Sequence, residues 1–305
     1  MITGIKTFPR NVQIKSQLGY SSKGEPFTVT MTRNIIVLPE KPMRPRYADP
    51  RIGYFDEKKE YFTDKEDGVV PVSYIKRWNL QPVDSSAYHR GELTEVIKPI
   101  VFYIDTAIPR KWRPYIKEGV LEWNKAFEKI GFKNVIQVQD FPTNDPNFDP
   151  DDFKYSCIRY LPTDVENAMG PSWTDPRTGE IINATVLVYN DVVNTIDDWR
   201  FVQTSQIDPR ARVARMPDDI VSETLEYIIA HEVGHTLGLM HNMAASAAIP
   251  TDSLRSVSFT QQYGTTASIM DYARFNYVAQ PEDNISEKGI FPRINDYDEW
   301  AINWG

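Results

Sequence analysis

The chain has 305 residues, an apolar fraction of 41% and a formal net charge of −8, which suit a packed protein of one large or two ordinary domains and exclude intrinsic disorder. The sequence has no Lys/Arg-rich run and no apolar run long enough to span a bilayer, which argues against nucleic acid, an anionic membrane surface and a transmembrane segment. The single cysteine, Cys157, excludes an internal disulfide framework and a thiolate metal cluster.

The N-terminal part of the chain is rich in proline, arginine and tyrosine. Its short alternating runs predict β-strands, for example over residues 27–39 (FTVTMTRNIIVLP). Residues 41–55 (KPMRPRYADPRIGYF) contain too many prolines for a helix, so we expect an ordered, extended segment. We therefore predict a mainly β accessory or pro-segment over 1–95 and a second domain over 96–305.

After residue 95 the pattern changes to strands alternating with helices. KPIVFYID, at 98–105, is an apolar run typical of a buried strand. Apolar residues then recur at helical spacing over 113–132, where Gly131 is placed to end a helix. The runs at 135–140 (VIQVQD) and 155–162 (YSCIRYLP) predict further strands. The order strand, helix, strand indicates a right-handed βαβ unit with a parallel pair.

The next segments lead to a second predicted helix. Two extended runs joined by a Pro-Gly turn over 173–191 predict a hairpin, and residues 191–216 are expected to form a long polar loop. Pro217, Asp218 and Asp219 then open a helix, because proline and acidic residues are favoured at a helix N-terminus. Its inner face is expected to carry Ile220, Thr224, Ile228, His231 and His235.

Three of the four histidines of the chain lie within the eleven residues HEVGHTLGLMH. His231 and His235 are four residues apart and therefore project from one helix face. Gly238 is well placed to end the helix in a left-handed turn, which lets the chain bring His241 toward the other two. Three imidazoles and one water make an open, catalytic zinc site, and zinc lowers the pKa of that water toward ~7.

Glu232 follows the first histidine directly, so its carboxylate can take a proton from the bound water and later pass it to a leaving amine. The alternative is an ordinary helix with two core histidines and a surface glutamate, which a match to HExxH alone does not exclude. With Gly238 and His241 added, the pattern is far more restrictive, and it favours one catalytic zinc ion.

These residues resemble the metzincin zinc peptidases, because HEVGHTLGLMH matches their signature HExxHxxGxxH at every specified position. The resemblance places Met270, in SIMDYAR at 268–274, in the Met-turn beneath the zinc. SIMDY is also similar to the SxMxY form of astacins and serralysins, which gives Tyr272 the role of a switchable extra zinc ligand and a hydrogen-bond donor in catalysis. Packing in the core is the alternative for both Met270 and Tyr272.

The resemblance implies an α/β (α+β) fold for residues 96–305, with a twisted mixed sheet, an active-site helix and a Met-turn. INDYDEWAINWG, at 294–305, resembles the helix that closes such domains. Asn242 follows the third histidine, where the well-known subfamilies often have Asp, Glu, Ser or Pro. The chain is therefore most similar to large secreted bacterial metzincins whose catalytic domain is embedded in a longer chain.

The implied activity is zinc-dependent endopeptidase hydrolysis of peptide bonds by Glu-activated water. In metzincins an edge strand pairs with extended substrate, and residues 168–175 (AMGPSWTD) are the candidate for it. A solvent-exposed hairpin without a partner is the alternative for this segment. Two other functions stay open, namely a zinc amidohydrolase acting on a non-protein amide and a zinc-stabilised binding module without turnover. The presence of Glu232 argues against the binding module.

Several other features need a separate interpretation. The four aspartates of NDPNFDPDDF, at 144–153, could hold Ca²⁺, but their spacing fits no calcium loop, so a solvated acidic loop is the main alternative. We expect His89 at the surface and Cys157 buried and inert. The N-terminal third contains no cysteine to block the zinc, which leaves Asp49 or Asp56 as candidates for that role.

The location of the protein follows from the expected activity. The N-terminus lacks the apolar stretch and cleavage site of a signal peptide, which fits a cytosolic chain or a piece of a longer precursor. Because export suits a broad peptidase, we expect an extracellular or periplasmic protein that is part of a longer exported precursor.

Overall fold

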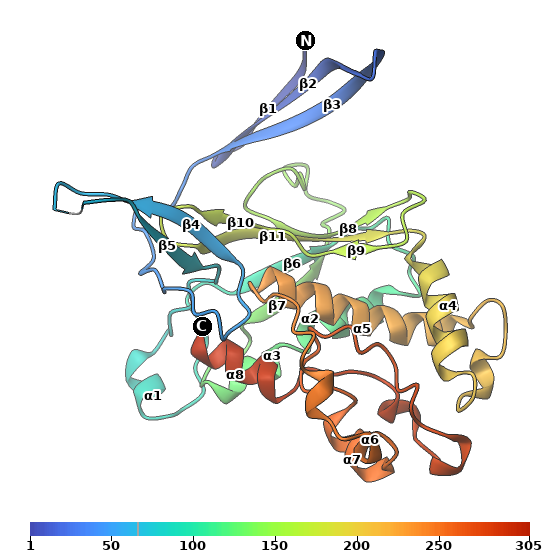
Figure 1. Ribbon diagram of the computed structural model, residues 1–305. Helices are drawn as coiled ribbons and strands as arrows, with labels where there is room; N and C mark the ends of the chain where they lie inside the picture. Colours follow the sequence, from blue (N-terminus) through green and yellow to red (C-terminus); the bar gives the residue numbers. More distant parts are fainter. Residues whose placement is uncertain (66) are drawn as a thin grey trace.

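The computed structural model describes residues 1–65 and 67–305 (Figure 1). At its centre lies a mixed sheet of six strands in the order β10-β11-β8-β6-β7, with β9 also paired to β11. The strands are β6 (Ile100–Ile104), β7 (Ile136–Asp140), β8 (Ser156–Leu161), β9 (Ala168–Met169), β10 (Ser172–Asp175) and β11 (Glu180–Tyr189). β7, β6, β8 and β11 pair in parallel, whereas β9 and β10 run antiparallel to β11. The predicted α/β class with a mixed sheet is confirmed.

The predicted βαβ unit is present. β6 buries Ile100, Phe102 and Ile104, the alternate residues of the strand, and it leads through a helical segment to the parallel strand β7. This segment consists of two helices, α2 (Arg113–Leu121) and α3 (Asn124–Lys129). The interruption lies at Trp123, which is fully buried and donates its indole N–H to the carbonyl of Ala230 at 2.8 Å.

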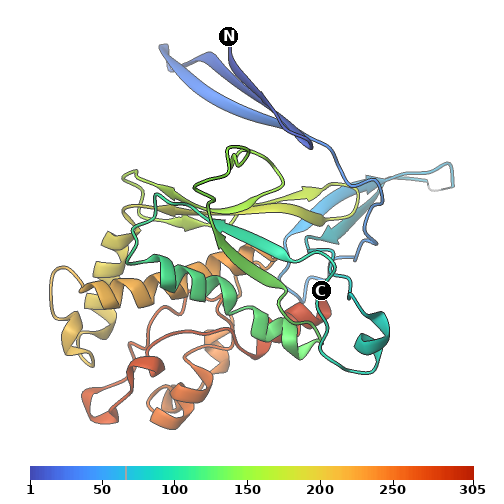
Figure 2. The ribbon, with the colours of Figure 1, turned by 180° about the vertical axis from the view of Figure 1, so that it is seen from behind.

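The helix predicted from Pro217 onward is α5 (Asp218–Thr236). Figures 1 and 2 show α2 and α5 side by side on one face of the sheet. Four of the five residues predicted for its inner face, Ile220, Thr224, Ile228 and His231, are buried, and the fifth, His235, is half-buried. The helix therefore brings its histidines to the underside of the sheet, near the antiparallel edge.

The predicted polar loop over 191–216 is wrong, because this segment contains α4 (Val192–Thr204) and a 3-10 turn (Pro209–Ala211). The buried positions of α4 are four residues apart: Val192, Ile196, Arg200 and Thr204. Two of these four are polar, so the hydrophobic period of the helix is weak. Arg200 is fully buried and donates to the carboxylate of Asp208 at 2.9 Å, which satisfies part of its guanidinium.

The chain after α5 forms the lower part of the molecule. Short helices α6 (Thr251–Leu254) and α7 (Val257–Tyr263) and three 3-10 turns precede the last helix, α8 (Asp296–Trp304). Helix α8 confirms the predicted closing helix. Asn295 and Asp298 form a capping box at its start. The side chain of Asn295 accepts the backbone N–H of Asp298, and the side chain of Asp298 accepts the backbone N–H of Asn295.

The N-terminal part is mainly β, as predicted. It contains β1 (Ile2–Thr7), β2 (Asn11–Ser22), β3 (Glu25–Ile36), β4 (Asp56–Tyr61) and β5 (Val70–Ile75), followed by the short helix α1 (Ser85–His89). Strands β1 to β3 form an antiparallel sheet that stands away from the rest of the molecule (Figure 1). Lys6 ties this sheet to Asp149 and Asp151 of the acidic loop at 2.9 and 2.7 Å.

Strands β4 and β5 form a second, two-stranded sheet, and residues before β4 and at the end of β5 join the main core. Ile52, Tyr54 and Ile75 are buried in the same apolar cluster as helix α5, and the hydroxyl of Tyr54 donates to the carbonyl of Ala301 at 2.9 Å. Residues 41–55 form no helix, as predicted, but they are not extended throughout, because the N–H of Ile52 closes a turn on the carbonyl of Asp49 at 3.0 Å. The N-terminal segment is thus packed into the body of the protein, and a domain boundary at residue 95 stays a prediction.

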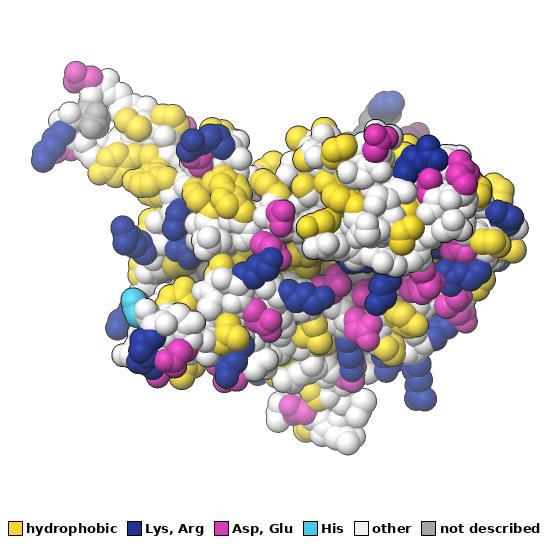
Figure 3. All heavy atoms as spheres, turned by 90° about the horizontal axis from the view of Figure 1, so that it is seen from below, with side chains coloured by type: hydrophobic (Ala, Val, Ile, Leu, Met, Phe, Trp, Pro, Cys, Tyr) yellow, Lys and Arg dark blue, Asp and Glu magenta, His cyan; other side chains and the backbone are white. Residues whose placement is uncertain are grey.

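The surface mixes charges of both signs. On the face shown in Figure 3, lysine and arginine side chains are interspersed with aspartate and glutamate. Within residues 1–65 and 67–305, no helix is both long and apolar enough to cross a membrane.

Candidate metal centre

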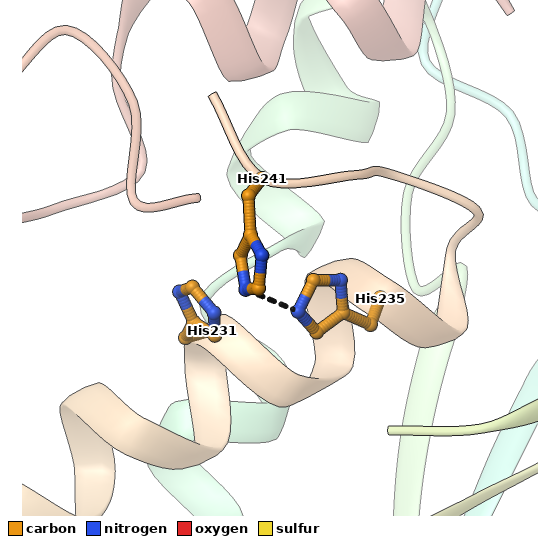
Figure 4. Close-up of side chains that lie close together, drawn as sticks. All are labelled: His231, His235 and His241. Carbon is orange, nitrogen blue, oxygen red and sulfur yellow. Dashed lines mark hydrogen bonds between the residues drawn. The ribbon is translucent and has the colours of Figure 1, made fainter. Parts of the chain in front are cut away.

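The three histidines of the motif meet at one point. His231 and His235 come from the last turns of α5, and His241 comes from the loop that follows it (Figure 4). One ring nitrogen from each residue lies within 4.8 Å of the others. In the part of the chain that the structure describes, no other group of histidine, cysteine, aspartate or glutamate has this metal-binding geometry.

Backbone carbonyls orient two of the three rings. Nδ1 of His231 lies 2.7 Å from the carbonyl oxygen of Ile269, and Nδ1 of His235 lies 2.8 Å from that of Leu239. An Nδ1–H that donates to a carbonyl leaves the lone pair on Nε2. Nε2 of His231 is buried without a hydrogen-bond partner, and Nε2 of His235 faces Nε2 of His241 at 3.1 Å. A metal ion among the three nitrogens would satisfy all of them.

The surroundings keep these imidazoles neutral. Burial, followed by the neighbouring His235, lowers the pKa of His231 to about 3, and burial lowers the pKa of His235 to about 4. Burial and the charge of Arg274 also lower the pKa of His241. Neutral imidazole is the form that binds a transition metal, so the cluster is prepared for metal at neutral pH.

Glu232 lies beside the histidines with a buried carboxyl group. Burial raises the pKa of Glu232 to about 7, although the backbone N–H of Gly170 stabilises its charged form. A carboxylate with a pKa near neutral can both accept and return a proton at physiological pH.

The turn that carries His241 requires glycine. Gly238 follows α5 with φ = +100°, as predicted for the left-handed turn that ends the helix. A Cβ at this position would also overlap the carbonyl oxygen of Lys76, from the N-terminal segment. The turn is therefore fixed both by its backbone conformation and by a close neighbour distant in sequence.

Met270 and Tyr272 lie where the Met-turn was expected. Met270 is fully buried, and a Cβ at Gly234 would overlap its sulfur, so it packs under α5 between the two helical histidines. The backbone carbonyl of Met270 accepts the N–H of Asn242 at 3.0 Å, which holds the chain after the third histidine. The ring of Tyr272 lies 4.3 Å from that of His241, centroid to centroid, and the residue is 44% exposed.

Comparison with known protein families agrees with this geometry. Residues 214–305 match a family model described as Met-zincin. The chain carries a metzincin segment. Residues 1–83 match a second model, described as a domain of unknown function (DUF5117). No curated protein and no solved structure matches the chain.

The histidine cluster lies in a cleft beside the edge of the sheet. A cleft of about 500 Å³ runs between residues 167–172 and the side chains of Glu232, His235, His241 and Tyr272. Residue 170 must be glycine for the strand edge to lie this close to α5, because a Cβ there would overlap the carbonyl oxygen of Glu232. β9 and β10 lie at the sheet edge, as predicted for residues 168–175.

The N-terminal segment braces the metal loop of the metzincin segment, which sequence patterns did not reveal. The N–H of Phe55 donates to the carbonyl of Gly238, and the N–H of Met240 donates to the carbonyl of Gly53, both at 2.8 Å. The ring of Phe55 lies 5.7 Å from that of His235. Trp78 donates its indole N–H to the carbonyl of Thr236 at 2.9 Å. These contacts join residues about 160 to 190 positions apart, so no local signal could have identified them.

Other residues singled out in the sequence lie elsewhere. His89 is exposed on α1, and Cys157 is buried in β8, where burial raises the pKa of its thiol to about 12. Asp49 binds Arg51, and neither Asp49 nor Asp56 lines the cleft. In the acidic loop, two of the four aspartates pair with Lys6 and a third, Asp152, with Lys154.

Proposed function

We propose that the protein is a zinc-dependent endopeptidase. The observation that carries this proposal is the convergence of three neutral imidazoles, with one buried orphan Nε2, beside a buried carboxyl group in an open cleft. His231, His235 and His241 would hold one zinc ion. When bound, zinc would act there as a Lewis acid that polarises a carbonyl group and makes water more acidic.

In this proposal Glu232 is the general base. Its carboxylate accepts a proton from the attacking water and returns it to the leaving amine, which a pKa near 7 favours in both directions. Tyr272 is the second catalytic residue, because its half-exposed ring lies beside His241 and is free to aim its hydroxyl at the developing oxyanion.

The substrate would be a protein or peptide bound as an extended strand along β9 and β10. β9 lies at the sheet edge and lines the cleft together with Glu232 and the histidines. A free strand edge offers main-chain hydrogen bonds to a peptide of any sequence. This geometry supports cleavage within a chain rather than hydrolysis of a small amide, which would need no edge strand.

Metal content and hydrolysis together test the proposal. We expect one zinc per chain, lost in His231→Ala, His235→Ala and His241→Ala but kept in His89→Ala, whose histidine lies outside the site. Glu232→Gln should keep zinc and lose hydrolysis of casein and peptides by at least ~10². A zinc-loaded chain that cleaves small amides but no peptide would be an amidohydrolase. One that cleaves neither would be a zinc-stabilised binding module.

We also propose that the protein acts outside the cytoplasm, within a longer exported chain. An open peptidase cleft with a half-exposed site would endanger the proteins of the cytoplasm. Immunodetection in fractionated cells tests this, and a signal confined to the cytoplasmic fraction would contradict it.

A further inference from the structure

A second cavity lies next to the cleft, on the side of α4. Its volume is about 180 Å³, and it borders His231, Glu232 and Tyr272. The rest of its wall includes Val192, Thr195, Trp199, Tyr227, Ile228 and Arg274. The pocket therefore opens beside the proposed reacting centre and has room for one side chain of a residue close to the scissile bond.

Arg274 is held in this wall by two aromatic rings. Its guanidinium carbon lies 4.0 Å from the ring centre of Trp199 and 4.1 Å from that of Tyr272. Its backbone has φ = +58°, a left-handed conformation that non-glycine residues rarely adopt. Because the rings cover the faces of the guanidinium, its N–H groups lie at the edge, and one of them donates to the hydroxyl oxygen of Tyr227.

The charge of Arg274 has no carboxylate partner. No aspartate or glutamate among residues 1–65 and 67–305 comes within 4.0 Å of its guanidinium, in contrast to the paired Arg200 and Arg210. Glu166 also lines the pocket, but it is exposed and contacts the hydroxyl of Thr195 at 3.4 Å. The half-buried wall of the pocket thus carries an unpaired positive charge.

We propose that Arg274 makes this pocket select an acidic side chain at one residue that flanks the scissile bond. This inference rests on the proposed peptidase function and adds the substrate class to it. A carboxylate can accept two N–H groups from one guanidinium, and such charge-assisted pairs are the strong hydrogen bonds of proteins. The two rings fix the guanidinium before substrate arrives, which reduces the entropy lost on binding.

Matched peptides test the selection. Peptides that differ only in Glu, Gln or Lys are compared at each residue flanking the cleavage point, with kcat/KM as the readout. The wild type should prefer Glu over Gln by about 10- to 100-fold at one of these positions, as expected for hydrogen bonds to a charged group. Arg274→Gln should bring that ratio close to one, and Arg274→Lys should keep part of it.

Glu166→Gln is the matched control, because it changes charge in the same pocket in the opposite direction. It should keep or increase the Glu preference. A preference lost equally in Glu166→Gln and Arg274→Gln would mean that pocket shape carries the selection, and it would overturn the proposal. The readout is the ratio of kcat/KM for the Glu and Gln peptides. A general loss of packing around Trp199 would lower both values and leave their ratio unchanged.

Binding separates this proposal from the peptidase function. Fluorescence anisotropy measures the affinity of the same labelled peptides for zinc-loaded Glu232→Gln, with and without Arg274→Gln. A Glu preference in binding that depends on Arg274, together with a zinc-loaded wild type that hydrolyses no peptide, would support the acid-selecting pocket and reject the peptidase. Hydrolysis by the wild type with no Glu preference would reject the pocket alone, and the absence of both would reject both.

Discussion

Asp298 and Ile269 are joined by a buried hydrogen bond, in which the carboxylate of Asp298 accepts the backbone N–H of Ile269 at 2.8 Å. The carbonyl of the same Ile269 accepts the Nδ1–H of His231 at 2.7 Å. One residue of the Met-turn therefore connects the last helix to the first histidine of the cluster. The Asp298 carboxylate also accepts the hydroxyl of Ser268 and the N–H of Asn295, so both its oxygens are used.

Asp298→Asn should destabilise the Met-turn. The amide keeps one acceptor oxygen for the N–H groups of Ile269 and Asn295, but it loses the negative charge and the second acceptor oxygen, which costs about 1–3 kcal/mol for a buried site. Urea unfolding of the zinc-free protein measures this loss, and zinc content reports the effect on the site. Asp296→Asn, at an exposed position in the same helix turn, should change stability by less than about 1 kcal/mol. Equal losses in the two variants would contradict the role of Asp298.

Tyr272→Phe should reduce kcat and kcat/KM together, by about 10²–10³, because the hydroxyl is proposed to act only in the transition state. The ring remains, so zinc content and unfolding should hardly change. Tyr277→Phe provides the control, since Tyr277 is also exposed, five residues further along the chain. A near-wild-type kcat for Tyr272→Phe would reduce Tyr272 to a packing residue.

Trp78→Phe should weaken the metal loop from a distance. It removes the indole N–H that satisfies the carbonyl of Thr236 at the end of α5, which costs about 1 kcal/mol. Since His241 follows this helix end by five residues, zinc binding should weaken as well. Competition with a chelator measures the zinc affinity. Trp300→Phe, which alters a half-exposed indole on α8, should leave that affinity unchanged.

Glu226→Gln should change the pH dependence of stability. Burial, then the nearby Glu122, raises the pKa of Glu226 from 4.5 to about 7. Between these values the folded state holds a proton that the unfolded state has lost, so the free energy of unfolding falls as pH rises from about 4.5 to 7. In Glu226→Gln this fall in the free energy of unfolding is absent, because glutamine does not titrate. Because Glu226 is half-exposed, the variant should be only about 1 kcal/mol more stable than the wild type at pH 8.

Thermal unfolding of zinc-free samples at pH 4.5 and 8 measures this difference, which should vanish at the lower pH. Glu60→Gln, at an exposed position of β4, should show no difference at either pH. A stabilisation by Glu226→Gln that is equal at both pH values would mean that charge is not its cause.

The sequence was sufficient where a local pattern determines the structure. The spacing of His231 and His235 requires one helix face, and Gly238 requires a left-handed turn, so the three imidazoles could be brought together without coordinates. The apolar run in residues 98–105 and the order of strands and helices likewise predicted the parallel part of the sheet.

Sequence reasoning failed where a buried polar residue replaces an apolar one or where contacts are distant. Arg200 occupies an inner position of α4, where its ion pair with Asp208 allows a charged residue to be buried. The apolar residues of α4 therefore do not recur at helical spacing, and the helix was not predicted. The position of Arg274 depends on Trp199, on that same unpredicted helix. The contacts of Phe55 and Trp78 with the metal loop depend on a fold that only long-range packing defines.

The hydrogen bonds between residues 53–55 and the metal loop affect the stage of synthesis at which the metal loop is supported. Residues 53 and 55 hydrogen-bond to the loop at 238–240, and the hydroxyl of Tyr54 donates to Ala301, so segments before and after the histidines in the sequence both support the metal loop. A ribosome-bound chain that has emerged only as far as the histidines would lack the support of α8. Proteolytic trimming that removed the first eighty residues would also remove these contacts with the metal loop, and the contact between Tyr54 and Ala301 can form only after translation has passed α8.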